Sequence, residues 1–240
     1  MKTKVLGKDT SNLKLKGIKL LEKIKRNKSD IKYGTDIWNV YDFLYLYNDL
    51  PSLKVLEIKI PSNSLFTIES KSMKLYLNGF YNQSFKSDKT VIQQIKKDLE
   101  GFLNAKIKLR IIKKFNQEPP AINLNNYKND KTKINTILKF NGFRSICPVT
   151  SQPDFATIYI QHKSEVTPSM EIIDHLLTYR TKGEFHERCI EDICSHLSLS
   201  FNLKSLTVIG RFMRRGGIDI NPIRSLAKNY PKKNIHDTFQ

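Results

Sequence analysis

The chain of 240 residues is poor in cysteine and in long apolar runs, and both shortages exclude classes of protein. Its three cysteines cannot all pair, so a disulfide-stapled secreted scaffold is excluded, and we expect reduced thiols and a cytoplasmic location. No window approaches the roughly 18 apolar residues of a transmembrane helix, so we expect no membrane span. The lysine-rich N-terminal residues contain no apolar core segment, so we expect no secretory signal.

The usual nucleotide and metal signatures are also missing. There is no Gly-x-Gly-x-x-Gly and no Gly-x-x-x-x-Gly-Lys, so any nucleotide must be held by something other than a Rossmann or P-loop site. The cysteines and histidines form no Cys-x-x-Cys or His-x-x-x-His spacing, so we expect no metal site.

Acidic residues are outnumbered by basic ones, 23 to 41, which gives a net charge of +18. Most of the excess lies in residues 1–140, where 28 Lys and Arg oppose 13 Asp and Glu, and nearly all of it is lysine. Seven of the nine arginines lie in residues 141–240. Because lysine is common on solvated faces and arginine makes planar contacts with anions, the arginines are the better candidates for specific contacts. A basic, non-catalytic protein that binds tRNA stays open as an alternative.

The first part of the chain has the composition and pattern of a globular module. Hydrophobic content of 39% and charged content of 27% are typical of a soluble protein with a core. Residues 1–35 are polar and predict an N-terminal arm. Periodicity then predicts two strands, a helix and a strand, at 36–47, 53–60, 88–103 and 105–115. A turn at 48–51 joins the first strands, Asp88 is the expected N-cap of the helix, and residues 116–135 predict a connection.

The second part repeats this order, with two strands, a helix and a basic turn at 155–162, 203–213, 184–201 and 214–217. A further helix is expected to begin with Thr167 as N-cap and Pro168 as its first residue. The repeated order predicts an α+β fold of two tandem modules, residues 36–135 and 136–240. Each is expected to be an antiparallel sheet backed by helices.

One segment of the second part places a cysteine and an aspartate seven residues apart. Pro148 and Pro153 both lie between them, and they predict a rigid loop rather than a strand or helix. A thiolate at Cys147 is a strong nucleophile, and a carboxyl at Asp154 can supply a proton as the thiol attacks. By spacing alone, a small buried apolar residue is the favoured interpretation of Cys147, because that is the usual environment of a free cysteine.

The last long helix is expected to open with His186 and Glu187 in its first turn. Cys189 and Cys194 share the apolar face of this helix, so we interpret both as core residues. A glutamate in the first turn is favoured by the helix dipole alone. Its functional alternative is a carboxylate that accepts two N–H groups from a purine edge.

Two further segments carry charge in suggestive places. Residues 214–217 read Arg-Arg-Gly-Gly after a strand and fit either an ordinary basic turn or a phosphate cradle. Residues 69–74 read Glu-Ser-Lys-Ser-Met-Lys at a strand-to-helix transition, which alone predicts only a helix start with a cationic face.

Taken together, these segments resemble one family, the NADPH-dependent 7-cyano-7-deazaguanine reductases, in its two-module form. The matching stretches are 34–38 (GTDIW), 68–78 (IESKSMKLYLN), 147–154 (CPVTSQPD), 184–187 (EFHE) and 214–222 (RRGGIDINP). They occur in the order of the family and span residues 34–222. The Glu-Ser-Lys and Cys…Asp segments are specific to the family, and the Arg-Arg-Gly-Gly segment is less so.

The resemblance implies a tunnelling fold and the reduction of a nitrile to a primary amine by two NADPH, in queuosine biosynthesis for tRNA modification. It makes Cys147 the nucleophile that forms a covalent thioimide, a better hydride acceptor than a nitrile. Asp154 would donate the proton to the nitrile nitrogen. His186 would lie near both the reacting group and the substrate.

The resemblance also implies binding residues and partners. The substrate-binding residues implied are Ile68, Glu69, Ser70, His186 and Glu187. The NADPH-binding residues implied are Ser70, Lys71, Arg215 and Gly216. A homodimer or higher homo-oligomer is expected, with a deazapurine substrate, no membrane partner and no nucleic acid required.

The chain departs from the family pattern in two places. The second module has lost the Glu-Ser-Lys pattern near residues 165–180, and the linker between the 105–115 strand and Cys147 is short, which bears on the dimer contacts. A related enzyme of the same fold, hydrolytic or thioimide-forming but without NADPH, is the other alternative. NADPH consumption distinguishes the two.

Overall fold

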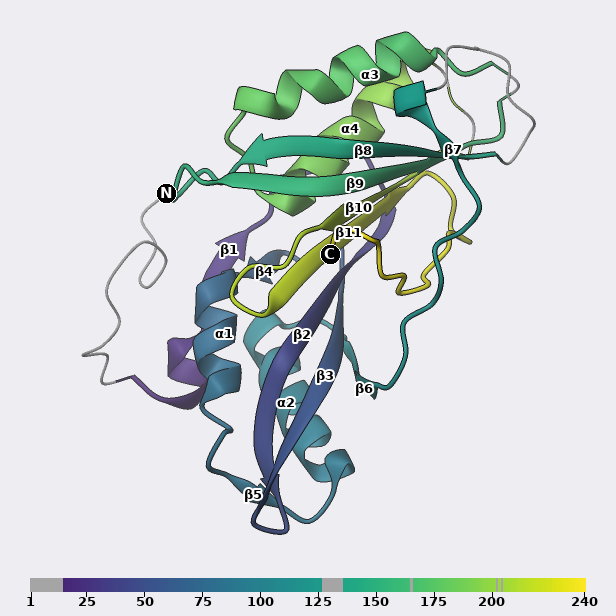
Figure 1. The fold of residues 1–240 in the computed structure, drawn as a ribbon. Coiled ribbons are helices and arrows are strands. Elements are labelled where there is room, and N and C mark those ends of the chain that lie inside the picture. The colour runs from purple at the N-terminus through teal and green to yellow at the C-terminus, as the bar shows by residue number, and fades with distance from the viewer. Residues whose placement is uncertain (1–14, 127–135, 165, 202, 204) are drawn as a thin grey trace. The chain divides into compact units, whose positions relative to one another are not determined.

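The computed structural model of the chain describes residues 15–126, 136–164, 166–201, 203 and 205–240 (Figure 1). The first 14 residues of the expected arm and residues 127–135 of the expected connection lie outside this part. The chain divides into two compact units. Of the described residues, unit 1 comprises those in 15–27, 37–114 and 214–219, and unit 2 comprises the others.

Unit 1 is built on a long hairpin of β2 (Tyr33–Tyr47) and β3 (Leu50–Pro61). The other elements are β6 (Lys108–Ile112), antiparallel to β3, a two-residue β5 (Ser84–Phe85) beside β2, and the paired β1 (Lys23–Lys25) and β4 (Phe66–Ile68). A 3-10 turn at Gly17–Leu20 precedes β1. Helices α1 (Ser70–Asn78) and α2 (Asp88–Leu103) pack apolar side chains against the hairpin, and Phe43 contacts both Tyr45 and Phe80.

Unit 2 has the strand order β11-β10-β9-β8-β7, in which β8 to β11 are antiparallel and β7 is parallel to β8. The strands are β7 (Ile122–Asn123), β8 (Ile137–Ile146), β9 (Pro153–Gln161), β10 (Thr207–Phe212) and β11 (Ile218–Ser225). Helices α3 (Ser169–Leu177) and α4 (His186–Phe201) cover one face of β8 and β9 (Figure 1). Short 3-10 turns lie at Leu124–Asn126 and Thr178–Thr181.

The core of unit 2 lies between these two helices and the sheet. Helix α4 buries residues three or four positions apart, which is the spacing of one helical face. These include Cys189, Ile190, Ile193, Cys194 and Leu197, all without solvent exposure. The interpretation of both cysteines as core residues is therefore confirmed, and burial raises the pKa of each thiol to about 12.

Strand β8 contains a β-bulge, because its register against β9 shifts by one residue between Phe140 and Phe143. Gly142 within the bulge has φ of +81°, a conformation that favours glycine. The bulge leaves Asn141 out of the β9 ladder. Its N–H donates to the side-chain oxygen of Asn125, and its carbonyl accepts from the side-chain nitrogen of the same residue. The bulge thus attaches the segment before β8 to the sheet.

The predicted class, α+β with antiparallel sheets and helices, is confirmed, as is the 88–103 helix. The turn between β2 and β3 is tight, with positive φ at Asn48 and Asp49, as two-residue hairpins prefer. The strands predicted at 105–115 and 203–213 are shorter than expected. Strands β8 and β11 were not expected.

Three local predictions were wrong. Ser87, not Asp88, caps α2, because its hydroxyl accepts the N–H of Thr90. Pro168, not Thr167, is the N-cap of α3, since the Thr167 hydroxyl instead bonds Nε2 of His162. Pro153 is the first residue of β9 rather than part of a loop; a proline is tolerated at the start of a strand.

Candidate active site

In unit 2, Cys147 lies in a closed turn between β8 and β9. Its N–H donates to the carbonyl of Gln152 (2.8 Å), and its carbonyl accepts the N–H of Ser151 (3.0 Å). Ser151 has φ of +57°, so the chain reverses there without glycine. The cysteine is half-buried, in contrast to Cys189 and Cys194. Its backbone is held by two hydrogen bonds, and the residue stays partly exposed.

The same end of β8 is bonded to the segment that leads into α4. Ile146 donates its N–H to the carbonyl of Lys182 and accepts the N–H of Glu184, both at 3.0 Å. At the intervening Gly183, an added Cβ would lie 3.7 Å from the Cα of Pro148, so the two segments are in close contact. The Cys147 turn and the start of α4 are therefore neighbours.

Asp154 and His186 form a side-chain pair in this region. Asp154, the second residue of β9, is 5% exposed, and its Oδ1 lies 3.2 Å from Nε2 of His186, the first residue of α4. The imidazole stacks on Phe212 at 3.9 Å between ring centroids and 9° between planes, which fixes its orientation. Its Nδ1 is buried and has no hydrogen-bond partner among the described residues.

This arrangement leaves Nδ1 of His186 in need of a partner. A neutral imidazole that donates from Nε2 to Asp154 presents Nδ1 as an acceptor, and a protonated one presents it as a donor. A buried polar atom without a partner costs free energy unless a ligand or water satisfies it. The pair is therefore suited to bind a polar group or to carry a proton.

Glu187, the next residue, lies in the first turn of α4 and is 8% exposed. Behind it, the fully buried Arg224 donates from Nη1 to Asp36 (2.7 Å) and from Nε to Glu191 (3.2 Å). Burial alone would lower the pKa of Arg224, but the carboxylates of Asp36, Glu191 and Glu187 together raise it. The guanidinium thus balances the acidic start of the helix.

In unit 1, Glu69 caps helix α1. Its two carboxylate oxygens accept the N–H groups of Lys71 (2.7 Å) and Ser72 (2.8 Å). Burial of the side chain raises the pKa of Glu69, and these N–H groups oppose that rise. Ile68 ends β4, and Ser70 and Lys71 are half-buried in the first turn of α1.

The basic turn of unit 1, residues 214–217, contacts helix α1. Arg215 and Ile218 exchange backbone hydrogen bonds of 2.8 and 3.1 Å, and Gly216 and Gly217 both have positive φ, +55° and +79°. The ammonium of Lys74, one turn along α1 from Lys71, contacts both the carbonyl of Gly216 and the carboxylate of Asp42. Helix α1 and the turn are thus joined within one unit.

Two family models match this chain, one in each half of the sequence. A family model described as the N-terminal part of nitrile reductase, 7-cyano-7-deazaguanine-reductase, matches residues 16–111. A second model, described as QueF-like protein, matches residues 153–231. A protein of Coxiella burnetii (strain RSA 331 / Henzerling II) is 32% identical over 228 residues, covering 87% of this chain and 82% of its own length. It is named NADPH-dependent 7-cyano-7-deazaguanine reductase.

Proteins of the same name in Acinetobacter baylyi and in Buchnera aphidicola subsp. Schizaphis graminum are also similar. The first is 30% identical over 249 residues, 92% of each chain, and the second is 32% identical over 231 residues, 85% of this chain and 87% of its own. This chain belongs to the NADPH-dependent 7-cyano-7-deazaguanine reductases. The two family models match successive stretches, as expected for a reductase of tandem tunnelling-fold modules.

The residues predicted for the reductase site fall into two clusters, one in each unit. Unit 2 holds Cys147, Asp154, His186 and Glu187, and unit 1 holds Ile68, Glu69, Ser70, Lys71, Arg215 and Gly216. Glu69 has a second role that the sequence did not reveal, as a helix cap. Sequence reasoning missed Asp36 and Arg224, although Asp36 lies within the GTDIW stretch.

The donor set of unit 1 fits a dinucleotide phosphate. Lys71 and the exposed Arg215 supply positive charge, Ser70 supplies a hydroxyl, and the positive-φ glycine pair exposes backbone N–H groups. At Gly216 an added Cβ would meet nothing within 4 Å, so the turn is open on that side. These groups are chemically suited to the pyrophosphate and 2′-phosphate of NADPH.

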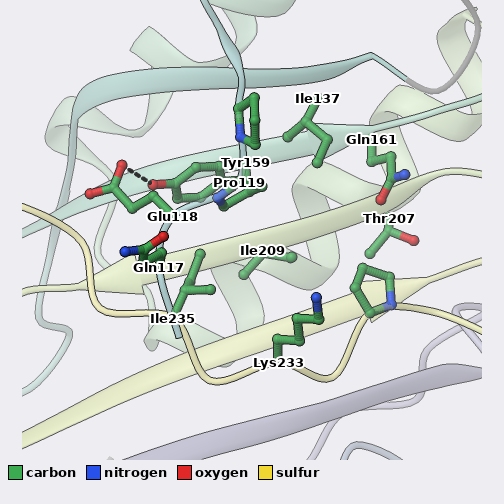
Figure 2. A pocket seen from close by; sticks show the side chains of 12 residues that line it. Gln117, Glu118, Pro119, Ile137, Tyr159, Gln161, Thr207, Ile209, Lys233 and Ile235 are labelled. Carbon is green, nitrogen blue, oxygen red and sulfur yellow. Dashed lines mark hydrogen bonds between the residues drawn. The ribbon is translucent and has the colours of Figure 1, made fainter. Parts of the chain in front are cut away.

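Unit 2 also contains a cavity, and none of the residues predicted for the reductase site lines it. This cavity of about 450 Å³ lies between residues 117–120, the sheet and residues 231–235 (Figure 2). The nearby carboxylates of Glu118 and Asp237 already accept hydrogen bonds from Lys139, Tyr159 or Thr238. Its floor includes Ile137 and Gln161, at the end of the β8–β9 hairpin away from Cys147.

The described residues include neither a cluster suited to a metal ion nor a helix suited to span a membrane. Within that part of the chain, no three His, Cys, Asp or Glu side chains gather closely enough to hold a metal ion. None of the helices there has the length and apolar character that a membrane crossing requires.

Proposed function

We propose that this chain reduces the nitrile of 7-cyano-7-deazaguanine to an aminomethyl group with NADPH, in queuosine biosynthesis. The observation that supports it best is the cluster at the end of β8. A half-buried cysteine there lies beside a buried Asp154–His186 pair whose Nδ1 has no partner among the described residues. The family to which the chain belongs and the cationic donor set of unit 1 are consistent with the same reaction.

Cys147 would begin the reaction by adding its sulfur to the nitrile carbon. The S–H bond and one C–N π bond break, and an S–C bond and an N–H bond form, so the thiol adds overall across the nitrile and gives a thioimide. The closed turn holds the backbone of Cys147 in place, so little reorganisation is needed on attack.

Asp154 would deliver the proton of the N–H bond as negative charge develops on nitrogen, and His186 would orient it. The 3.2 Å contact and the stack on Phe212 hold the two side chains together. Nδ1 of His186 would then bind a polar atom of the substrate, which satisfies the buried ring nitrogen.

Glu187 would accept N–H groups from the deazaguanine edge, with Ile68, Glu69 and Ser70 as further substrate contacts. A carboxylate matches two adjacent N–H groups in a planar, bidentate manner. The buried guanidinium of Arg224 lies close enough to Glu187 for the carboxylate to help raise the pKa of Arg224, so the contact lies beside a fixed positive charge.

NADPH, held by Ser70, Lys71, Arg215 and Gly216, would supply one hydride for each of the two reduction steps between nitrile and amine. We propose further that residues 36–135 and 136–240 are the two modules, and that the protein is a cytoplasmic homodimer or higher homo-oligomer. Light scattering on the purified protein tests the oligomer, and a monomeric mass would contradict it.

The deciding experiment is NADPH oxidation by the purified protein with 7-cyano-7-deazaguanine, beside Cys147→Ala. We expect two NADPH consumed per nitrile and a covalent adduct by intact mass, both lost in the variant. An adduct without NADPH oxidation would indicate a related enzyme with another second substrate. Neither signal, with salt-sensitive RNA binding, would favour the tRNA-binding alternative.

A further inference from the structure

Three groups of unit 1 meet at the base of the basic turn. The ammonium of Lys74 on α1 contacts the carboxylate of Asp42 on β2 and the carbonyl of Gly216 in the turn. Both charged side chains are partly exposed, 33% for Lys74 and 47% for Asp42. Lys74 thus links a strand, a helix and the turn that carries Arg215.

We propose that Asp42 and Lys74 act as a positioning pair, which sets the Arg215–Gly216 turn relative to the first turn of α1 and thereby determines NADPH affinity. The inference rests on the proposed function. In this arrangement neither member of the pair touches the cofactor.

The turn needs such a support because its own structure is weak. Two successive glycines have positive φ and confer little stiffness. Its backbone contacts include the Arg215–Ile218 pair and the N–H of Tyr41, which donates to the carbonyl of Gly217 at 2.9 Å. Lys74 adds a further attachment, at the residue between Arg215 and Gly217.

The packing below the turn leads to the same conclusion. A Cβ added at Gly217 would lie 2.5 Å from Oδ2 of Asp42, closer than atoms can approach. The carboxylate of Asp42 therefore lies directly against the turn and fills the space beneath it. Any shift of Asp42 changes the surface on which the turn rests.

The charge of Lys74 is also already matched. Its ammonium is neutralised by Asp42 and donates to a backbone carbonyl, so a phosphate would have to compete with both. Lys71 and Arg215, the two cations predicted to contact the cofactor, lie on the two elements that Lys74 joins. Lys74, the second lysine of the Glu-Ser-Lys-Ser-Met-Lys segment, thus positions the turn and does not bind the cofactor itself.

An ion pair this exposed contributes little to global stability, so its loss should move the turn without unfolding the protein. The test compares Asp42→Asn and Lys74→Met with the wild type. NADPH binding is measured directly by calorimetry, adduct formation by intact mass, and thermal stability by calorimetric scanning. The matched control is Lys54→Met, which removes another exposed pair of unit 1, Lys54–Asp88 at 3.9 Å.

We expect both variants of the pair to weaken NADPH binding by roughly tenfold, the effect of one well-placed contact. Adduct formation, which needs no cofactor, and the melting temperature should stay as in the wild type, and Lys74→Arg should restore most of the affinity. The Lys54→Met control should bind NADPH normally.

Three results would overturn the inference. Weak binding in Lys74→Met with normal binding in Asp42→Asn would make Lys74 a direct cofactor contact. Parallel losses of binding, adduct formation and melting temperature would make the pair merely structural. Normal NADPH binding in both variants would exclude the positioning role but leave the proposed function intact. A wild-type protein that binds no NADPH would exclude both.

Discussion

Nε2 of His186 lies 3.2 Å from Oδ1 of Asp154, and the two residues come from the first turn of α4 and the start of β9. The contact joins a helix to a strand at the end of the sheet where Cys147 is held. Because His186 also stacks on Phe212, the pair is fixed in orientation before any ligand binds. Preorganisation of this kind is what a proton-transfer pair requires.

Replacement of Asp154 by asparagine tests the proton-transfer role. The amide keeps the size of the side chain and can still accept from His186, but it cannot donate a proton as a carboxylic acid does. Adduct formation at Cys147 should slow by roughly 10²- to 10⁴-fold, as expected for loss of a general acid. Rapid quenching with intact-mass detection measures the rate. A variant that forms the adduct normally but binds substrate poorly would contradict the role.

Replacement of Glu187 by glutamine tests the substrate contact. The amide has one acceptor oxygen where the carboxylate has two, so one N–H of the deazaguanine edge would lose its partner. Substrate affinity should fall by roughly 10- to 100-fold, which is the usual result of an unpaired buried donor. Calorimetry in a Cys147→Ala background measures binding without chemistry, and an unchanged affinity would exclude the contact.

Glu69→Gln predicts a pH-dependent change in stability. Burial raises the pKa of Glu69 in the fold, so the folded state binds more protons than the unfolded chain. The stability from this titration is fully present below the unfolded pKa of about 4.3 and is lost as the pH rises through the folded pKa. In urea denaturation, the stability of the variant relative to the wild type should therefore increase as the pH rises from about 4 through the folded pKa of Glu69. A difference that stays constant over this range would refute the prediction.

Arg224→Met should destabilise the protein strongly. The substitution leaves Asp36 buried without its cation, which typically costs about 3–5 kcal/mol. Adding Asp36→Asn should recover part of the loss, since the orphaned charge is then removed. Arg188→Met is the matched control: Arg188 pairs with Glu191 and Asp192 near the surface, and its loss should cost about 1 kcal/mol or less. Equal losses in both variants would argue against the buried pair.

The stacked pair of His175 and His196, with ring centroids 3.6 Å apart, predicts acid sensitivity. Burial, with His196 beside it, lowers the pKa of His175 to about 4, so the fold holds this ring neutral. The unfolded chain takes up its proton near pH 6.5, and stability is therefore lost as the pH falls from about 6.5 to about 4. His175→Phe should lose less stability over that interval, and an equal loss in both proteins would exclude His175 as the cause.

Local patterns were sufficient to predict α2 and the buried cysteines of α4. The apolar residues of both helices recur at 3.6-residue spacing, which a single segment displays in full. The resemblance placed Cys147, Asp154, His186 and Glu187 in one region, and the structure brings Asp154 and His186 into contact. Their chemical roles stay predictions.

Contacts between distant residues were beyond such patterns. Arg224 and Asp36 are 188 positions apart, and Lys74 and Asp42 are 32 apart, so neither pair has a local signal. Asp154 was not predicted to lie in a strand, because Pro153 argued against a strand there. A proline disfavours strands because it has no N–H to donate, but Pro153 is the first residue of β9, a position that needs no such donor. Glu69 as a cap was equally hidden, since glutamate is not among the preferred N-cap residues.

The bulge in β8 has a consequence for changes in chain length. Leu138, Phe140 and Phe143 all reach the core because the extra residue between Phe140 and Phe143 is taken up without reversing the alternation of the strand. A deletion of Gly142 would leave these three side chains on their present face. A deletion at Ser145 would instead turn Ile146 over and shift Cys147 by one place relative to Asp154. Strand β8 should therefore tolerate a deletion of Gly142 but not a deletion of Ser145, three residues later.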